Sequence, residues 1–117
     1  MKTHRLDDFY KGWIIGNFDP ALLKTTEFEV GIHTHKKGGP SEPHYQLTSC
    51  EYNVIIKGKL IANEKTLSDG DIFIYEPLIP CYVEFLEDTI IVCVKTPSVG
   101  PEDKILVTED EKQDGTI

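Results

Sequence analysis

Three polar side chains that could carry chemistry gather around one turn, between Gly38 and Gly58. His44 and Gln46 are two residues apart, so in an extended strand both side chains point to the same side. Glu51 follows after a short break, and a paired strand would bring its carboxylate opposite them. An imidazole and a carboxylate together suit Fe, Mn, Ni or Zn, with open positions left for a substrate. The same residues could instead form a hydrogen-bonded polar cluster that holds no metal.

A second histidine pair, His33 and His35, precedes this turn. The strand expected to begin at Glu27 carries apolar side chains at alternate positions, among them Val30 and Ile32. If these apolar side chains form the core, the two histidines lie on the outside. A β-bulge would instead turn them toward His44, Gln46 and Glu51, where they could act as metal ligands. The sequence alone leaves this alternative open.

Short strands must position all of these residues. Runs rich in Val, Ile and Tyr, such as 51–57, 72–75 and 90–95, are separated by turn signals roughly every 8–12 residues. No segment of useful length has a helical period. The pattern predicts an all-β sandwich or barrel in a single domain.

Composition limits the classes of function. The chain has 117 residues, and no apolar run approaches the roughly 18–20 residues that span a bilayer. No signal-peptide core is visible at the N-terminus, so we expect a cytoplasmic protein without a membrane partner. The net charge of −8 argues against a nucleic-acid partner. Three cysteines without a CxxC pair indicate reduced thiols.

The expected organisation is an N-terminal arm over residues 1–16, a barrel over residues 17–108 and a solvated acidic tail over residues 109–117. Small barrels of this kind have open sheet edges, and pairing these edges is favourable. We therefore expect a homodimer, with the N-terminal arm as the candidate contact.

The spacing around the turn resembles the first motif of the cupin family, which has a glycine, an HxH pair, a glutamate and a closing glycine. Five residues stand in register with it: Gly38, His44, Gln46, Glu51 and Gly58. Gln46 stands where the second histidine would be. Residues 70–77 resemble the start of the second cupin motif, and Cys81 occupies the place of its histidine.

This resemblance implies a double-stranded β-helix, or jelly-roll barrel, that holds a metal or a small molecule in its mouth. The metal ligands it implies are His44, Gln46, Glu51 and Cys81. A glutamine carbonyl is a weak ligand, whereas a thiolate at Cys81 would be a strong one for Zn or Fe.

Two of these residues, His44 and Glu51, are the expected catalytic residues. Asn53 shares the face of Glu51 and, with Tyr75, is a candidate to line the ligand pocket together with Gln46 and Cys81.

Three functions compete, and the sequence does not decide whether the protein is an enzyme. The first is a metal-dependent oxygenase, isomerase or lyase for a small polar molecule. The second is a metal-free isomerase or epimerase of nucleotide sugars, with His44 as general base and Glu51 orienting it. The third is a binding module for a small-molecule ligand, without catalysis.

Overall fold

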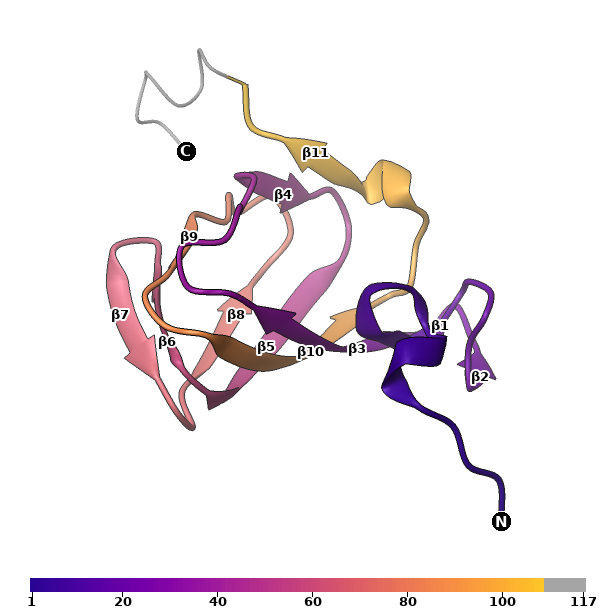
Figure 1. Cartoon of the computed structure of the whole chain (residues 1–117). Helices are drawn as coiled ribbons and strands as arrows, with labels where there is room; N and C mark the ends of the chain where they lie inside the picture. The colour runs from indigo at the N-terminus through magenta and orange to yellow at the C-terminus, as the bar shows by residue number, and fades with distance from the viewer. Residues whose placement is uncertain (109–117) are drawn as a thin grey trace.

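The structure, a computed structural model, describes residues 1–108, and the expected acidic tail lies outside the described residues. The described chain consists of strands and turns (Figure 1), as the sequence predicts. Three short 3-10 helices interrupt them at Leu6–Asp8, Tyr10–Gly12 and Pro101–Asp103. Within residues 1–108, no helix has the length and apolar character needed to cross a membrane.

The strands form three sheets. The largest has six strands in the order β2-β1-β3-β10-β5-β8, a second has the order β7-β6-β9, and β11 pairs with β4. The strand bounds are β1 Trp13–Gly16, β2 Leu23–Lys24, β3 Glu29–His35, β4 His44–Gln46, β5 Cys50–Lys57, β6 Lys59–Ala62, β7 Lys65–Ser68, β8 Ile72–Tyr75, β9 Val83–Phe85, β10 Thr89–Thr96 and β11 Lys104–Leu106. Across the described residues, the three sheets surround an interior but do not join into one closed barrel.

The hydrophobic core lies between the six-stranded and the three-stranded sheets. Ile55 and Leu60 are 0% exposed and pack with Phe85 and Ile91. Gly58 makes the corner between β5 and β6 with a φ of 123°, and a Cβ there would lie 2.7 Å from the Asp88 carbonyl oxygen. A glycine is therefore required where the chain passes from one sheet to the other.

Strand register fixes which side chains of the six-stranded sheet face the interior. Three rows of paired residues share this inner face: Glu29–Lys95–Glu51–Tyr75, Gly31–Cys93–Asn53–Phe73 and His33–Ile91–Ile55. Ile55 and Ile91 belong to the core, so the other members of these rows also point inward. The alternate residues make two rows that we call the outer face: Val30–Val94–Tyr52–Ile74 and Ile32–Val92–Val54–Ile72.

The structure decides the alternative that the sequence leaves open: His33 and His35 lie on the inner face of the sheet. His33 pairs with the core residue Ile91, and β3 pairs with β10 without a register shift, so no bulge is needed to turn the histidines inward. The alternation in β3 is real, but its apolar members, Val30 and Ile32, belong to the outer face. Apolar side chains therefore occupy both faces of this sheet, which is why the alternation alone does not show which face is the core.

Residues 13–16, expected as part of the arm, form β1 and pair with β3.

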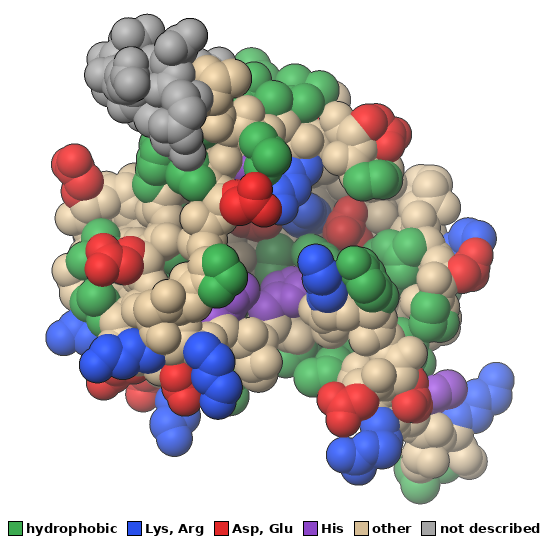
Figure 2. All heavy atoms as spheres, turned by 45° about the horizontal axis from the view of Figure 1, so that its top comes forward, with side chains coloured by type: hydrophobic (Ala, Val, Ile, Leu, Met, Phe, Trp, Pro, Cys, Tyr) green, Lys and Arg blue, Asp and Glu red, His purple; other side chains and the backbone are tan. Residues whose placement is uncertain are grey.

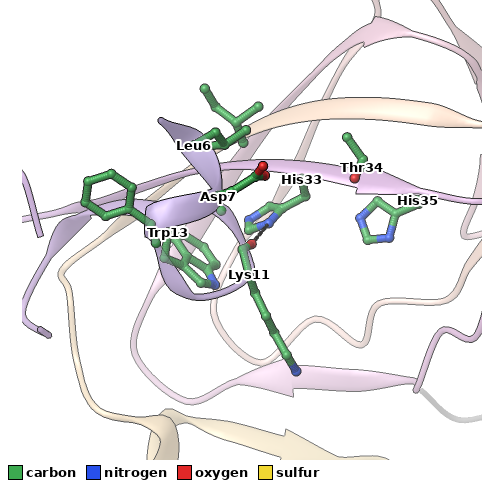
Figure 3. Close-up of a pocket in the computed structure, with 10 residues that line it drawn as sticks. Leu6, Asp7, Lys11, Trp13, His33, Thr34 and His35 are labelled. Atoms are coloured by element: carbon green, nitrogen blue, oxygen red, sulfur yellow. Dashed lines mark hydrogen bonds between the residues drawn. The ribbon is translucent and has the colours of Figure 1, made fainter. Parts of the chain in front are cut away.

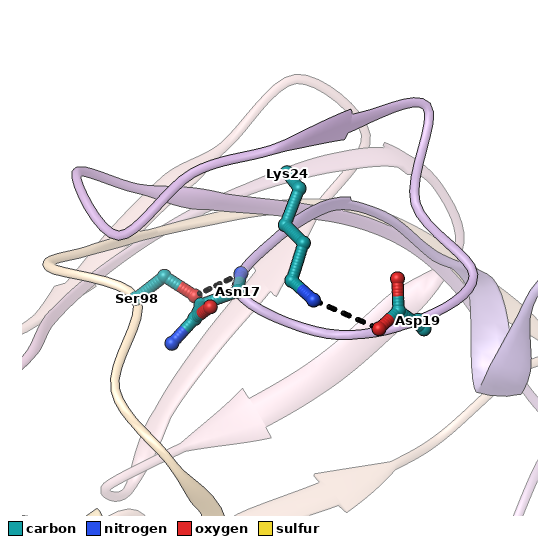
Figure 4. Close-up of polar contacts among 4 residues, drawn as sticks. All are labelled: Asn17, Asp19, Lys24 and Ser98. Carbon is teal, nitrogen blue, oxygen red and sulfur yellow. Dashed lines mark hydrogen bonds and ion pairs between the residues drawn. The ribbon is translucent and has the colours of Figure 1, made fainter.

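A single buried hydroxyl, that of Ser98, fixes the turn that follows β1 (Figure 4). Ser98 Oγ accepts a hydrogen bond from the Asn17 backbone N–H at 2.9 Å and donates one to Glu29 Oε1 at 3.2 Å. The Lys24–Asp19 ion pair beside it, at 2.8 Å, is exposed and contributes little to stability. Ser98 therefore ties the turn to the inner row that contains Glu29.

Asp103 fixes the strap that carries β11 across β4. Its carboxylate accepts hydrogen bonds from the Thr48 backbone N–H at 2.9 Å, the Thr48 hydroxyl at 2.6 Å and the Ser49 backbone N–H at 3.2 Å. Burial alone would raise the pKa of Asp103, but these hydrogen bonds outweigh it and hold the pKa below its usual value. The strap in turn places Lys104 beside Gln46.

Candidate functional site

The predicted site residues meet between the inner face of the six-stranded sheet and the β4–β11 pair. Figure 2 shows a hollow on this side of the molecule, with histidine side chains inside it and lysine and acidic side chains around it. The Glu51 carboxylate is central to this interior. It accepts a hydrogen bond from Asn53 Nδ2 at 3.2 Å, and its strand position pairs with Lys95. Its charge acts on six surrounding groups: Glu29, His33, His44, Tyr75, Cys81 and Cys93.

His44 is held in one tautomer. Its Nδ1 lies 2.9 Å from the Glu42 carbonyl oxygen, and since a carbonyl only accepts, Nδ1 must carry the proton. Burial lowers the pKa of His44, and the nearby Lys104 and Lys95 add to this effect against the Glu42 hydrogen bond. The ring is therefore neutral at pH 7, with an unprotonated Nε2 that can take up a proton.

His33 repeats this arrangement on β3. Its Nδ1 lies 2.8 Å from the Lys11 carbonyl oxygen, so this ring also has its lone pair on Nε2 (Figure 3). That Nε2 is buried and has no hydrogen-bond partner. The Trp13 ring packs edge-on against His33 with 4.5 Å between centroids, and burial lowers the pKa of His33. An unsatisfied buried acceptor of this kind calls for a donor from a water or a ligand.

His35, two residues after His33 on β3, lies on the same inner face of the sheet. Its ring stacks on Phe85 with centroids 4.2 Å apart and planes at 10°, and burial lowers its pKa. A groove of about 510 Å³ opens beside His33 and His35, between the N-terminal segment from Leu6 to Trp13 and β3 (Figure 3). The two histidines therefore border both the interior and this groove.

Gln46 and Cys81 lie at the other side of the interior, on and beside β4. Gln46 is 3% exposed, and its amide nitrogen, Nε2, has no hydrogen-bond partner. The Cys81 backbone N–H donates to the His44 carbonyl at 2.7 Å. Burial, with a further contribution from Glu51, raises the pKa of the Cys81 thiol to about 12. Cys81 is therefore a neutral thiol at pH 7, not a thiolate.

The hydroxyl of Tyr75 is held by a hydrogen bond to a neighbouring side chain. Its hydroxyl donates a hydrogen bond to Asn63 Oδ1 at 2.8 Å, and the same oxygen accepts from the Tyr82 backbone N–H at 2.8 Å. Burial raises the pKa of Tyr75, so its phenol stays protonated. Only the remaining lone pairs of this hydroxyl are free for a ligand.

The residues implied as metal ligands share the interior without forming a cluster. Among the residues from 1 to 108, no three His, Cys, Asp or Glu side chains approach closely enough to hold one metal ion. A neutral thiol at Cys81 and an amide at Gln46 are also weak donors. The arrangement therefore does not fit the four-ligand site that the motif spacing implies.

Two lysines that sequence reasoning missed border the candidate site. Lys95 stands on the inner row beside Glu51, with its Nζ 5.1 Å from the Trp13 ring centroid, and Lys104 lies on the strap over β4. Lys104 is exposed, and the charges of both lysines lower the pKa of His44 and that of Cys81. The alternation of Lys95 with Ile91 and Cys93 is the signal that places it inside.

No protein-family model and no curated protein matches the sequence. Solved structures do match the fold. A double-stranded β-helix protein of Klebsiella pneumoniae has a TM-score of 0.67 at 18% identity, with 91% of each chain covered.

Two further structures have known ligands. Pac13 of Streptomyces, a nucleoside dehydratase solved with uridine, has a TM-score of 0.60 at 13% identity over 71% of this chain and 70% of that one. The pirin YhhW of Escherichia coli, solved with nickel(II), has a TM-score of 0.59 at 16% identity over 75% of this chain. The match spans only 39% of the pirin chain.

These similarities define the fold: the chain is a small, single domain with a double-stranded β-helix, the fold that the motif spacing implies. At identities of 20% or less they establish the fold alone. Function must be argued from the site itself.

Proposed function

We propose that this cupin domain binds a small hydroxylated anion in its interior and that His44 acts on it as a general base. One observation carries the proposal. His33 and His44 each donate their Nδ1–H to a backbone carbonyl, which leaves two fixed Nε2 lone pairs in the region around Glu51. Two such acceptors suit a ligand with hydroxyl groups.

The charges in the interior indicate the rest of the ligand. Lys95 and Lys104 both act on His44, in a chain whose net charge is −8. Two ammonium groups near one neutral imidazole favour a carboxylate or a phosphate there. The unpartnered Gln46 Nε2 supplies a further donor for an oxygen of the ligand. A hydroxy acid or a sugar phosphate has this combination of groups.

The chemistry that follows is proton transfer. His44 Nε2 removes a proton from a carbon beside the carboxylate, or from a hydroxyl, and the resulting imidazolium returns it to the product. Lys95 and Lys104 stabilise the negative charge that develops on the ligand oxygens. These steps suit an isomerase or a lyase. Pac13, which shares the fold, catalyses a dehydration, which is also a proton-transfer reaction.

A metal-dependent reaction is the second candidate, because nickel binds in a protein of the same fold and two imidazole lone pairs are available here. The metal would be Fe, Mn, Ni or Zn, and the side chains that bind it would first have to move closer together. Elemental analysis of the wild-type protein, His44→Ala and Glu51→Ala tests this candidate. Stoichiometric metal that both substitutions remove would favour it over the metal-free reaction.

Thermal denaturation with a panel of ligands tests the proposal. The panel holds hydroxy acids, sugar phosphates, nucleotide sugars, nucleosides and neutral sugars. A ligand at one hundred times its dissociation constant stabilises the folded state by about 2.7 kcal/mol. We expect anionic hydroxylated compounds to raise the Tm and neutral sugars to leave it unchanged. The proposal fails if no anion shifts the Tm, or if Lys104→Met responds as strongly as the wild type.

A further inference from the structure

We infer that the outer face of the six-stranded sheet is the contact surface of a homodimer. The two rows that form this face contain eight residues, all of them Val, Ile or Tyr and none of them charged. Charged residues make up 27% of the whole chain, so a solvated sheet face would be expected to carry some. Antiparallel sheets normally alternate apolar residues inside with polar residues outside. This sheet departs from that pattern on its outer side.

The part of the outer face on β8, with the neighbouring Tyr52, is open to solvent in the monomer, and the other five residues of the two rows are half-buried. Ile72 is 63% exposed and Ile74 is 52% exposed, and Tyr52 beside them is also exposed. Ile56 and Ile90 are also exposed, at the register shift between β5 and β10, where Ile90 pairs with Lys57 at the border of the apolar surface. Contiguous apolar patches of more than a few hundred Å² are rare on monomers and mark interaction sites.

A second copy of the chain is the partner that fits this surface. Two copies that each carry a net charge of −8 repel one another over most of their surfaces, and the charge-free outer face is where they can approach. A flat sheet face is also self-complementary about a two-fold axis, because sheets pack face to face about 10 Å apart. Residues 109–117, EDEKQDGTI, are mostly charged and do not have the composition to cover an apolar sheet.

The size of the surface is consistent with a dimer. Four strands about 4.8 Å apart, over about six residues of about 3.4 Å each, give a footprint on the order of 400 Å². A stable interface buries about 800 Å² on each partner, with an apolar core inside a polar rim. The outer face therefore supplies the apolar core of such an interface. This contact replaces the N-terminal arm as the expected dimer surface, and it does not depend on the ligand in the interior.

Light scattering after size-exclusion chromatography, at several protein concentrations, tests the inference. We expect the wild-type chain to have twice its monomer mass of 13.2 kDa. The double variant Ile72→Glu/Ile74→Glu should have the monomer mass and an unchanged far-ultraviolet circular dichroism spectrum. Two controls with the same change elsewhere should remain dimeric: Leu23→Glu on the exposed edge strand β2 and Tyr10→Glu on the arm.

A milder pair, Ile72→Thr/Ile74→Thr, keeps the β-branched side chains and guards against a folding defect in the glutamate variant. We expect it to raise the dimer dissociation constant by about tenfold or more, since it removes apolar area from the centre of the contact. A monomeric wild-type protein would overturn the inference. A folded glutamate variant that stays dimeric would overturn it as well, as would dissociation caused by Tyr10→Glu alone.

Discussion

The imidazole of His33 occupies the space that a side chain at Gly31 would need. A Cβ added at Gly31 would lie 2.5 Å from His33 Nε2 and 2.7 Å from its Cε1. The absence of a side chain at position 31 lets the ring lie back along β3 while its Nδ1 reaches the Lys11 carbonyl at 2.8 Å. Gly31 therefore sets the direction of the unpartnered Nε2.

Gly31→Ala should displace the His33 ring and weaken ligand binding. We expect a loss of about 1–3 kcal/mol in the free energy of unfolding, which is typical of overpacking in a filled interior. Urea denaturation of the single and double variants with His33→Ala measures how much of this loss comes from the His33 contact. If Gly31→Ala costs the same in both backgrounds, the ring of His33 is not what the methyl group meets.

The stability of the protein should fall as the pH drops below about 6.5. Burial lowers the pKa of His33, His35 and His44 in the folded state, so the unfolded chain binds protons at a higher pH than the folded chain does. Their contribution is complete above the unfolded pKa and is lost as the pH falls toward the folded values.

Tm measured from about pH 7.5 to about pH 5.5 should therefore decrease toward acid. His44→Gln should flatten the decrease, whereas a change at the exposed His4 should not. The pKa of Glu29 is raised by burial and acts in the opposite direction at the acid end. Two results would show that His44 is not held neutral: a Tm that increases as the pH is lowered, or a decrease of Tm toward acid that is the same in His44→Gln as in the wild type.

Much of the fold could be predicted from the sequence because its signals are local. Period-two runs and turn residues identify strands within a few positions. The spacing from Gly38 to Gly58 adds a resemblance to the first cupin motif, which implies the same fold. Local signals could not show which alternate residues of β3 face the interior, because apolar residues lie on both faces of the six-stranded sheet. The inward side of His33 depends on its pairing with Ile91, which lies far along the chain.

The site was harder to predict than the fold. His44 and Glu51 share the interior, but the direction of the His33 lone pair depends on a carbonyl 22 residues away in sequence. Lys104 stands opposite Gln46 through the pairing of β11 with β4, next to the Asp103 anchor of the strap. Contacts between distant segments decide such details, and no local pattern carries them.

Asp103→Ala should destabilise the protein and loosen the strap. The carboxylate holds two backbone N–H groups and one hydroxyl, and a buried polar group left without its partner costs about 1–3 kcal/mol. Hydrogen exchange should become faster in β11 and β4. The neighbouring exposed Glu102→Ala is the matched control and should leave both measurements unchanged. Equal effects of the two substitutions on stability and hydrogen exchange would contradict the conclusion that Asp103 anchors the strap.

Lys95→Met and Lys104→Met should each weaken the binding of an anionic ligand by about tenfold or more, because charged hydrogen bonds contribute about 1.5–3 kcal/mol. Added salt should reduce the affinity of the wild type more than that of either variant. Lys59→Met on β6, an exposed position, is the control. Calorimetric titration measures all four proteins, and equal affinities throughout would show that the two lysines do not face the ligand.

Nitrogen-15 chemical shifts of the histidine rings test the proposed site most directly. At pH 7 we expect His33 and His44 to carry their proton on Nδ1, and we expect a bound hydroxylated anion to move the Nε2 signals of both. His4, exposed in the arm, should not respond. Protonated Nε2 atoms in the free protein, or a tightly bound anion that leaves both Nε2 signals unchanged, would contradict the proposed binding site.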